Sequence, residues 1–259
     1  MTQALRIAVI GVGHLGQHHA RLLSAMDGVD LVGVVDTRPG RAREIAAKYG
    51  TTAFTDAAEV AERVDAVSIA TPTTSHVDLA LPFIAAGVPV LIEKPIASSL
   101  EAADRLIAAS DGGAPVAIGH TERFNPAVAA ALPLVSEPRF IEIHRLGTFP
   151  ERSLDIDVIF DLMIHDLDVL LAVVRSEVVS VEAVGVNVLT PRADIANARL
   201  RFASGCIANV TASRISRDRV RKARFFQRSS YVSIDYAAQE VDVYRLLTQD
   251  GRPAIQGGR

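Results

Sequence analysis

Hydrophobic positions in residues 1–120 form short apolar runs that are separated by amphipathic stretches of helical period. The apolar runs predict strands at 6–11, 31–36, 65–71, 89–93 and 115–119, and a shorter strand near 52–54. The intervening stretches predict helices at 14–26, 40–49, 57–63, 75–87 and 99–110. Apolar strands that alternate with helices are typical of a parallel sheet covered on both faces. We therefore predict a doubly wound α/β domain over residues 1–120.

The pattern changes after residue 120, where long β-like runs replace this alternation. A helix is expected at 126–135, a strand at 139–147 and a second helix at 158–174. Further strands are expected at 178–189, 195–203, 206–216, 220–235 and near 239–246, and residues 250–259 have the composition of a loop. Consecutive strands favour a mostly antiparallel sheet, so residues 121–259 are predicted to form an α+β domain.

Three glycines follow the first predicted strand, at the point where the first helix should begin. Gly11, Gly13 and Gly16 form the pattern G-x-G-x-x-G, with His14 and Leu15 inside it. In a strand–turn–helix context this pattern binds the pyrophosphate of a dinucleotide on the free N–H groups of the helix start. The first glycine permits the turn, the second the close approach of the ligand, and the third the packing of helix on strand. The sequence thus predicts a Rossmann dinucleotide-binding domain.

The second strand ends in Asp36, close to the spacing of about 20 residues expected for the carboxylate that binds the adenosine ribose. A carboxylate at this position favours NAD over NADP, because the 2′-phosphate of NADP would meet a like charge. Arg38 and Arg41 follow closely and are suited to binding such a phosphate, so NADP stays open as the alternative.

Composition narrows the class of protein. The chain has 259 residues, a net charge of −3 and a pI near 6.2, which argues against a nucleic-acid-binding or membrane-surface protein. Cys206 is the single cysteine, so an intrachain disulfide and a cysteine-based zinc site are both excluded, and we expect a small core residue there. The sequence shows neither a long apolar run nor a secretory leader, so we expect a cytoplasmic protein.

Candidate catalytic and cofactor-binding residues follow two of the predicted strands, at the strand ends where α/β sheets bind ligands. Glu93 and Lys94 end one strand, and a lysine there can stabilise an alkoxide as it forms, although a plain surface lysine is the alternative. After another strand, Thr71 and Pro72 are placed to line the nicotinamide ribose. His76 is expected at a helix start near the cofactor.

The helix predicted at 158–174 carries a charged stripe on an otherwise apolar surface. At 100° per residue Asp161, His165 and Asp168 share one side, and Asp166 is the other polar position. Because burial of such groups is costly without partners or a role, the stripe indicates either catalysis or a satisfied His–Asp pair. His165 suits a general base near neutral pH, with Asp161 orienting it or holding a substrate hydroxyl. A third ligand for a metal is missing, so no metal is predicted.

Two further groups of residues are open to two interpretations each. Arg123 and Asn125 lie where the domains join in the sequence and are candidates for substrate binding, while Arg123 is equally suited to a structural ion pair. A basic cluster forms either a solvated face or a diphosphate site. The cluster consists of Arg214, Arg217, Arg219, Arg221, Lys222, Arg224 and Arg228.

The order of the motifs G-x-G-x-x-G, T-P-x-x-x-H, E-K-P and D-x-x-x-H resembles the glucose–fructose oxidoreductase / inositol dehydrogenase / rhizopine catabolism (Gfo/Idh/MocA) family over almost the whole chain. The stretches G-H-T-E-R-F-N-P, D-L-M-I-H-D-L-D and R-K-A-R-F-F-Q are similar to its UDP-N-acetylglucosamine 3-dehydrogenase branch. The resemblance implies NAD-dependent oxidation of the C3 hydroxyl of a UDP-N-acetylhexosamine to a 3-keto sugar. Dehydrogenation of another sugar or inositol, and a non-catalytic NAD-binding regulator, are the alternatives.

The resemblance also implies roles for individual residues. Lys94 would lie beside the nicotinamide and the reacting hydroxyl, Asp161 and His165 would bind substrate, and His165 would be the acid/base. The second domain would bind a sugar nucleotide and form a homodimer or homotetramer. Family members usually extend further and end in a helix, so we expect this chain to lack a C-terminal cap.

Overall fold

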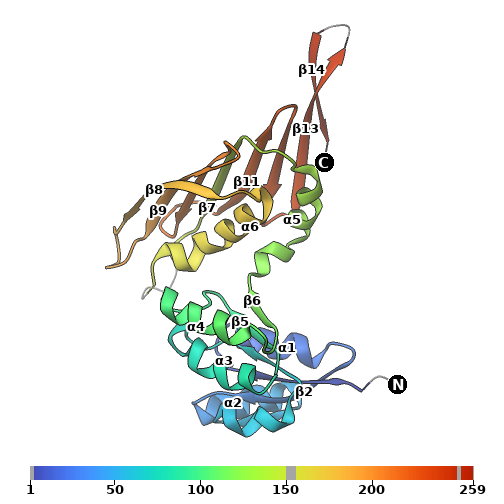
Figure 1. Cartoon of the computed structure of the whole chain (residues 1–259), viewed down its shortest axis with the longest axis vertical. Helices are drawn as coiled ribbons and strands as arrows, with labels where there is room; N and C mark the ends of the chain where they lie inside the picture. The colour runs from blue at the N-terminus through green and yellow to red at the C-terminus, as the bar shows by residue number, and fades with distance from the viewer. Residues whose placement is uncertain (1–2, 150–155, 250–251, 259) are drawn as a thin grey trace. The chain divides into compact units, whose positions relative to one another are not determined.

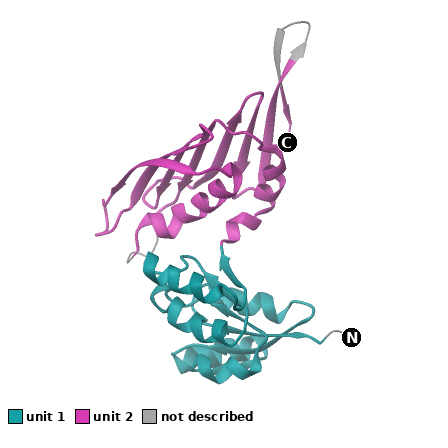
Figure 2. Ribbon diagram, viewed as in Figure 1, with its two compact units in different colours: residues 1–119 teal, residues 120–259 magenta. Residues whose placement is uncertain are grey.

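The computed structural model describes residues 3–149, 156–249 and 252–258. The chain divides into two compact units, residues 1–119 and 120–259 (Figure 2). We call them the first unit and the second unit. No helix among the described residues is long and apolar enough to cross a membrane.

The first unit is built on a six-stranded parallel sheet of order β3-β2-β1-β4-β5-β6 (Figure 1). This order is that of a dinucleotide-binding Rossmann fold and confirms the predicted fold class. The strands are β1 (Leu5–Ile10), β2 (Val29–Val35), β3 (Thr52–Phe54), β4 (Ala66–Ile69), β5 (Val90–Glu93) and β6 (Val116–Gly119). The helices are α1 (Gly16–Ser24), α2 (Pro39–Tyr49), the 3₁₀ segments η1 (Ala57–Arg63) and η2 (Thr73–Ser75), α3 (His76–Ala85) and α4 (Leu100–Ser110).

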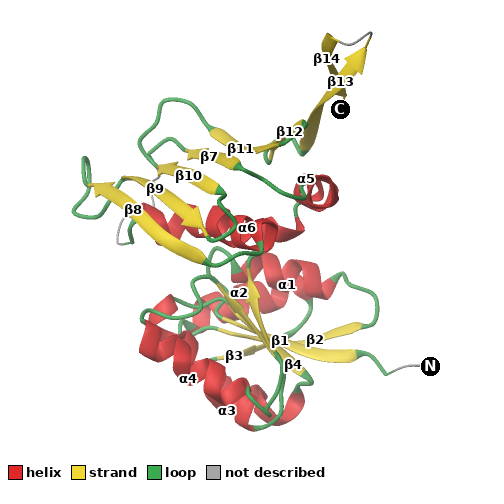
Figure 3. Cartoon of the chain, turned by 45° about the horizontal axis from the view of Figure 1, so that its top comes forward, coloured by secondary structure: helices red, strands yellow, loops and turns green. Residues whose placement is uncertain are grey.

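Helices cover both faces of this sheet, as the continuous apolar strands predict (Figure 3). Alternate residues of β1 point to opposite faces and join different cores. Val9 packs with residues of α1 and α2, such as Ala20 and Ile45. Ile10 packs with residues of α3 and α4, among them Phe83 and Leu106 in a second cluster. Because the strands of this sheet are all parallel, their carboxyl ends lie along one edge, where the loops that follow them begin.

The second unit contains an eight-stranded sheet of order β14-β13-β12-β11-β7-β10-β9-β8. Its strands are β7 (Phe140–Leu146), β8 (Val178–Val186), β9 (Ile195–Phe202), β10 (Ile207–Ser213), β11 (Val220–Gln227), β12 (Ser230–Asp235), β13 (Glu240–Gln249) and β14 (Arg252–Gly258). Only the pair β7 and β10 is parallel among these described ladders, so the sheet is mostly antiparallel, as predicted.

Helical segments cover one face of this second sheet (Figure 1). They are η3 (Thr121–Phe124), α5 (Pro126–Ala131), η4 (Leu132–Leu134), η5 (Ile159–Met163) and α6 (Ile164–Val174). On β7 the buried Ile141 and Ile143 face the core that includes Leu170, whereas Glu142 between them is half-buried on the other face. Cys206 belongs to the same core, as expected, and burial raises the pKa of its thiol to about 11.

Two predicted elements differ in the structure. The run predicted at 220–235 consists of two strands, β11 and β12, which pair as a hairpin. The sequence does not predict the turn after Gln227, because that turn lacks the glycine, proline, asparagine or aspartate that usually marks one. The prediction of a loop at 250–259 is wrong, since residues 252–258 pair as β14 with β13. Backbone pairing with β13 defines this strand. Its residues Pro253, Gly257 and Gly258 are of types that are unfavourable in strands, so the sequence does not predict it.

Candidate active site

The glycine motif forms a tight loop between β1 and α1. Gly11 has φ of +82°, a conformation that side chains disfavour, and its N–H donates to Val35 O. A Cβ on Gly16 would lie 1.8 Å from Gly11 O, so only glycine allows α1 to pack this closely. A Cβ on Gly13 would meet no atom within 4 Å, which leaves that side of the loop open. The loop therefore fits a pyrophosphate approaching at Gly13.

Asp36 lies directly after β2, where its buried carboxylate adjoins the glycine loop. It accepts hydrogen bonds from Val12 N–H (3.3 Å) and from the Arg38 side chain (3.0 and 3.3 Å). Burial raises the pKa of the Asp36 carboxyl, but the hydrogen bonds from Arg38 and Val12 outweigh burial and leave the pKa below its ordinary value. The group is thus an ionised acceptor, as binding of ribose hydroxyls requires.

The two arginines considered for a 2′-phosphate have different contacts. Arg41 Nε donates to Val12 O at 2.8 Å, and its other nitrogens contact Gln17 and Glu44. This guanidinium therefore supports the glycine loop. Arg38 is exposed and pairs with Asp36, so it is the residue of the two that faces solvent beside the ribose carboxylate.

His76 connects the loops that follow β4 and β5. Its side chain is 1% exposed, and its ring nitrogens lie 3.0 Å from Pro95 O and 2.9 Å from Thr71 O. Thr71 is half-buried and Pro72 is exposed in the first of these loops. The structure thus places His76 beneath the loops, where it fixes Thr71 against the segment after Lys94, and its contact with a cofactor stays a prediction.

Glu93 and Lys94 lie at the carboxyl end of β5, as predicted. Glu93 is buried, and its Oε1 lies 3.1 Å from Nε2 of His19 on α1. Nδ1 of the same imidazole lies 2.7 Å from Ser68 Oγ on β4. The half-buried Lys94 therefore follows a carboxylate that is fixed by a Ser–His–Glu chain, a feature that the sequence interpretation missed.

The helix that carries Asp161 and His165 consists of η5 and α6, and we call residues 159–174 the site helix. Its first turn is π-helical, with backbone hydrogen bonds from i to i+5. The spacing of 100° per residue, which places Asp161 on one side with His165, therefore does not apply in this turn. Asp161 and His165 are half-buried, while Phe160 and Leu171 are exposed. The otherwise apolar surface of this helix is therefore not buried all round. A π-helical turn is frequent at functional sites.

Asp166 is the fully buried carboxylate of the site helix, with 0% exposure. Two nitrogens of Arg145 on β7 donate to its carboxylate at 2.8 Å each, and a third donates to Glu122 at 2.7 Å. The Arg145 guanidinium also lies 5.3 Å from the ring of Tyr236. The pair ties the site helix to the sheet. Alternation on β7 places Arg145 on the same face as the buried Ile143, and this alternation is the signal in the sequence for a buried partner.

Arg123 and Asn125 both make contacts within the second unit. Arg123 forms a bidentate ion pair with Asp168 of the site helix, which is the structural alternative considered for it. Asn125 caps α5 by accepting from Ala127 N–H and donates to Tyr236 O at 3.0 Å. Asp168 is therefore a structural partner, and substrate binding by Arg123 and Asn125 stays a prediction.

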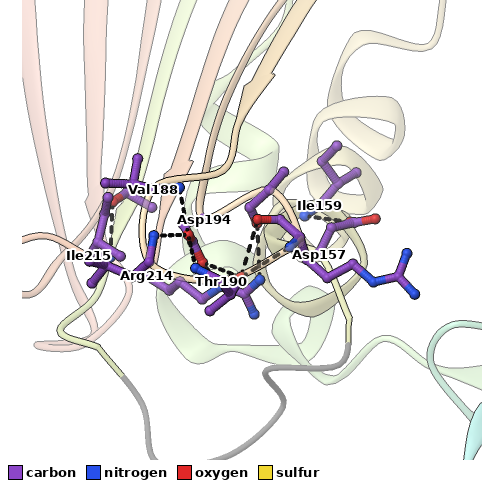
Figure 4. A network of polar contacts seen from close by, with 11 residues as sticks. Asp157, Ile159, Val188, Thr190, Asp194, Arg214 and Ile215 are labelled. Carbon is purple, nitrogen blue, oxygen red and sulfur yellow. Dashed lines mark hydrogen bonds and ion pairs between the residues drawn. The ribbon is translucent and has the colours of Figure 1, made fainter.

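The basic cluster is not one surface. Arg214 is 1% exposed and binds the buried Asp194 through Nε at 3.0 Å (Figure 4). Lys222 pairs with Asp235, and Arg224 pairs with Glu142. The predictions of a solvated face or a diphosphate site therefore fail for Arg214. Among the described residues, no three histidine, cysteine, aspartate or glutamate side chains gather as a metal site would need.

Two family models match the chain, one on each unit. Residues 5–120 match the model of an oxidoreductase family with an NAD-binding Rossmann fold, and residues 137–228 match the GFO/IDH/MocA C-terminal domain. The chain belongs to the Gfo/Idh/MocA oxidoreductase family. This membership confirms the resemblance drawn from the motifs, and it identifies NAD as the cofactor of the family. The open side of the glycine loop and the ionised Asp36 fit that cofactor.

Two relatives within the Gfo/Idh/MocA family are named for a sugar nucleotide and for inositol. The chain is 43% identical to UDP-N-acetylglucosamine 3-dehydrogenase of Acidithiobacillus ferrooxidans over 93% of its own length and 77% of that enzyme. The structure of that enzyme, GnnA, has a TM-score of 0.92 at 41% identity and covers 100% of this chain, which covers 83% of GnnA. The inositol 2-dehydrogenase of Rhizobium meliloti is 33% identical, and the match covers 69% of this chain and 58% of that enzyme.

Proposed function

We propose that this protein oxidises the C3 hydroxyl of a UDP-N-acetylhexosamine to a 3-keto sugar with NAD. The observation that carries the proposal is the 43% identity to UDP-N-acetylglucosamine 3-dehydrogenase over 93% of this chain. The glycine loop and Asp36 would hold the cofactor, through the helix start and the ribose hydroxyls respectively. When bound, NAD accepts the C3 hydrogen with its electron pair, while the hydroxyl loses its proton and becomes a ketone.

Lys94 is the residue of the first unit to which we assign a catalytic role. It lies at the carboxyl end of β5, where ligands of α/β sheets bind. Its ammonium group would donate to the substrate oxygen and stabilise the negative charge that develops as the O–H bond breaks. Glu93, the residue before Lys94, is fixed by the contact of its Oε1 with His19 Nε2 at 3.1 Å.

His165 is the residue of the second unit to which we assign the proton transfer. It is half-buried on the site helix, and a neutral imidazole accepts a proton near neutral pH. Asp161 lies one turn before it, in the first turn of the site helix, whose N–H groups are capped by Asp157. We assign to Asp161 a hydrogen bond to a substrate hydroxyl or to the imidazole.

The proposal is tested by NADH formation from UDP-N-acetylglucosamine, its C6 uronic acid and myo-inositol, each with NAD or NADP. Turnover of a UDP-sugar alone supports the proposal, and absence of turnover with every UDP-sugar refutes it. Lys94→Met and His165→Asn should each reduce kcat by at least about 100-fold, since general acid–base catalysis contributes 10²–10⁴-fold. Retained binding of NAD by these variants would show that the loss is chemical.

Inositol oxidation is the second candidate, and the 33% identity to an inositol 2-dehydrogenase favours it. Turnover of myo-inositol without any UDP-sugar would decide for it. Tight NAD binding with no turnover of any of these alcohols would instead favour a regulator.

We also propose a homo-oligomer, a dimer or tetramer. The resemblance supports it, and so do exposed valines on the edge strand β8, such as Val179 and Val181. A monomeric mass by light scattering would refute it. Cytoplasmic localisation stays a prediction.

A further inference from the structure

A second buried ion pair lies near the start of the site helix. Asp194 is 0% exposed, and its carboxylate accepts five hydrogen bonds from described residues. Its Oδ2 accepts from three successive N–H groups at 2.7–2.9 Å, and its Oδ1 accepts from Thr190 Oγ1 and Arg214 Nε. The three N–H groups belong to Val188, Leu189 and Thr190. The pair therefore fixes the β8–β9 connection against the end of β10.

One carbonyl group connects this pair to the site helix. Ala193 O accepts a hydrogen bond from Arg214 Nη2 at 3.1 Å and another from Val158 N–H at 2.9 Å. Val158 is the residue immediately before the helix, and it is buried. Figure 4 shows the two sides of the connection, with Arg214 and Asp194 on one side and Asp157 and Ile159 on the other. The guanidinium thus helps to fix the carbonyl that accepts from Val158 N–H.

The start of a helix depends on such acceptors, because its first N–H groups have none within the helix. Here Asp157 accepts from Ile159 and Phe160, and Ala193 accepts from Val158. The first turn is π-helical, a form that is rare and is retained where the surroundings hold it. If Ala193 moved, the turn would lose the bond at Val158, and a return to α-helical spacing would rotate Asp161 relative to His165.

We propose that Arg214 and Asp194 are positioning residues for Asp161 and His165, acting through Ala193 O on the first turn of the site helix. The inference rests on the proposed function, which assigns the chemistry to His165. We expect Arg214 to affect catalysis through Ala193 O and the orientation of the helix start.

The test uses Arg214→Lys, which keeps a buried cation beside Asp194. A lysine has a single nitrogen and cannot reproduce both the Nε bond to Asp194 and the Nη2 bond to Ala193 O. We expect kcat for the sugar nucleotide to fall by about 10- to 100-fold, the effect of a small misplacement of a catalytic group. The KM and Kd for NAD should change less than about twofold. The acidic limb of the kcat/KM profile against pH should also shift.

The matched control is Arg6→Lys, which makes the same change in the bidentate Arg6–Asp65 pair at the start of β1. It should leave kcat and the pH profile as in the parent chain. If Arg214→Lys also leaves both unchanged while lowering the unfolding midpoint, the pair only stabilises the fold and the proposal is overturned.

A second readout needs no substrate. Amide hydrogen exchange of residues 158–165 should be at least about tenfold faster in Arg214→Lys, because Ala193 O is no longer held in place for Val158 N–H and the first turn then opens more often. Unchanged exchange in this segment overturns the positioning role whatever the activity. If the parent chain oxidises no alcohol, the proposed function fails, and the exchange result still decides whether Arg214 fixes the helix start.

Discussion

Removing Arg145 should strongly destabilise the second unit. Its guanidinium makes three side-chain hydrogen bonds of 2.7–2.8 Å, two of them to Asp166, which has 0% exposure. Arg145→Met keeps the apolar stem and leaves the Asp166 carboxylate buried without its cation. Breaking a buried pair in this way costs about 3–5 kcal/mol. At about 2–4 °C per kcal/mol for a unit of this size, we expect the melting temperature to fall by about 6–20 °C.

Urea unfolding followed by circular dichroism measures this loss, and NAD binding reports separately on the first unit. The double variant Arg145→Met/Asp166→Leu removes both charges and should recover at least half of the lost free energy, because a buried pair contributes little net stability over apolar residues. The single variant should also regain stability at acid pH, as protonation removes the lone charge. A loss below about 1 kcal/mol for Arg145→Met would refute the reasoning.

Three further outcomes test other parts of the structure. Gly16→Ala should weaken NAD binding at least about tenfold in a calorimetric titration, because its Cβ would lie 1.8 Å from Gly11 O, and tight binding would contradict the loop geometry. Asp36→Ala should raise the KM for NAD and lower that for NADP, since the carboxylate is lost while Arg38 remains; an unchanged ratio of the two KM values would count against this assignment. Asp194→Asn should be less stable than the parent chain at pH 7. Burial raises the pKa of Asp194, but three N–H donors outweigh it and lower the pKa, so this difference should persist to about pH 4 and shrink only below it; a difference that already disappears near pH 6 would be inconsistent with this shift.

The first unit was predictable because its signals are local. Each strand of its parallel sheet is a continuous apolar run, and the glycines and Asp36 stand at fixed distances within one strand–helix–strand unit. The strand order then follows from the usual handedness of such connections.

The second unit was less predictable, because its decisive contacts join residues far apart in the chain. The apolar pattern marks the site helix, yet nothing local distinguishes Asp166, which needs a buried partner, from Asp161 on the same helix. In the sequence Arg145 belongs to a predicted strand and Arg214 to a basic cluster, and only the fold shows that both are buried. The π-helical first turn also escapes a search at 3.6 residues per turn.

The position of β7 in the middle of the second sheet also sets an order of assembly. On β7, Ile143 pairs with Val210 of β10 and with Ala223 of β11, and both partners are synthesised much later. A growing chain can complete the sheet of the first unit while β7 still has neither neighbour, since domains tend to fold in the order of synthesis. On the ribosome, Arg145 therefore emerges before the carboxylate of Asp166 that neutralises it, and the strand that carries it gains its two neighbours only after β10 and β11 have been synthesised.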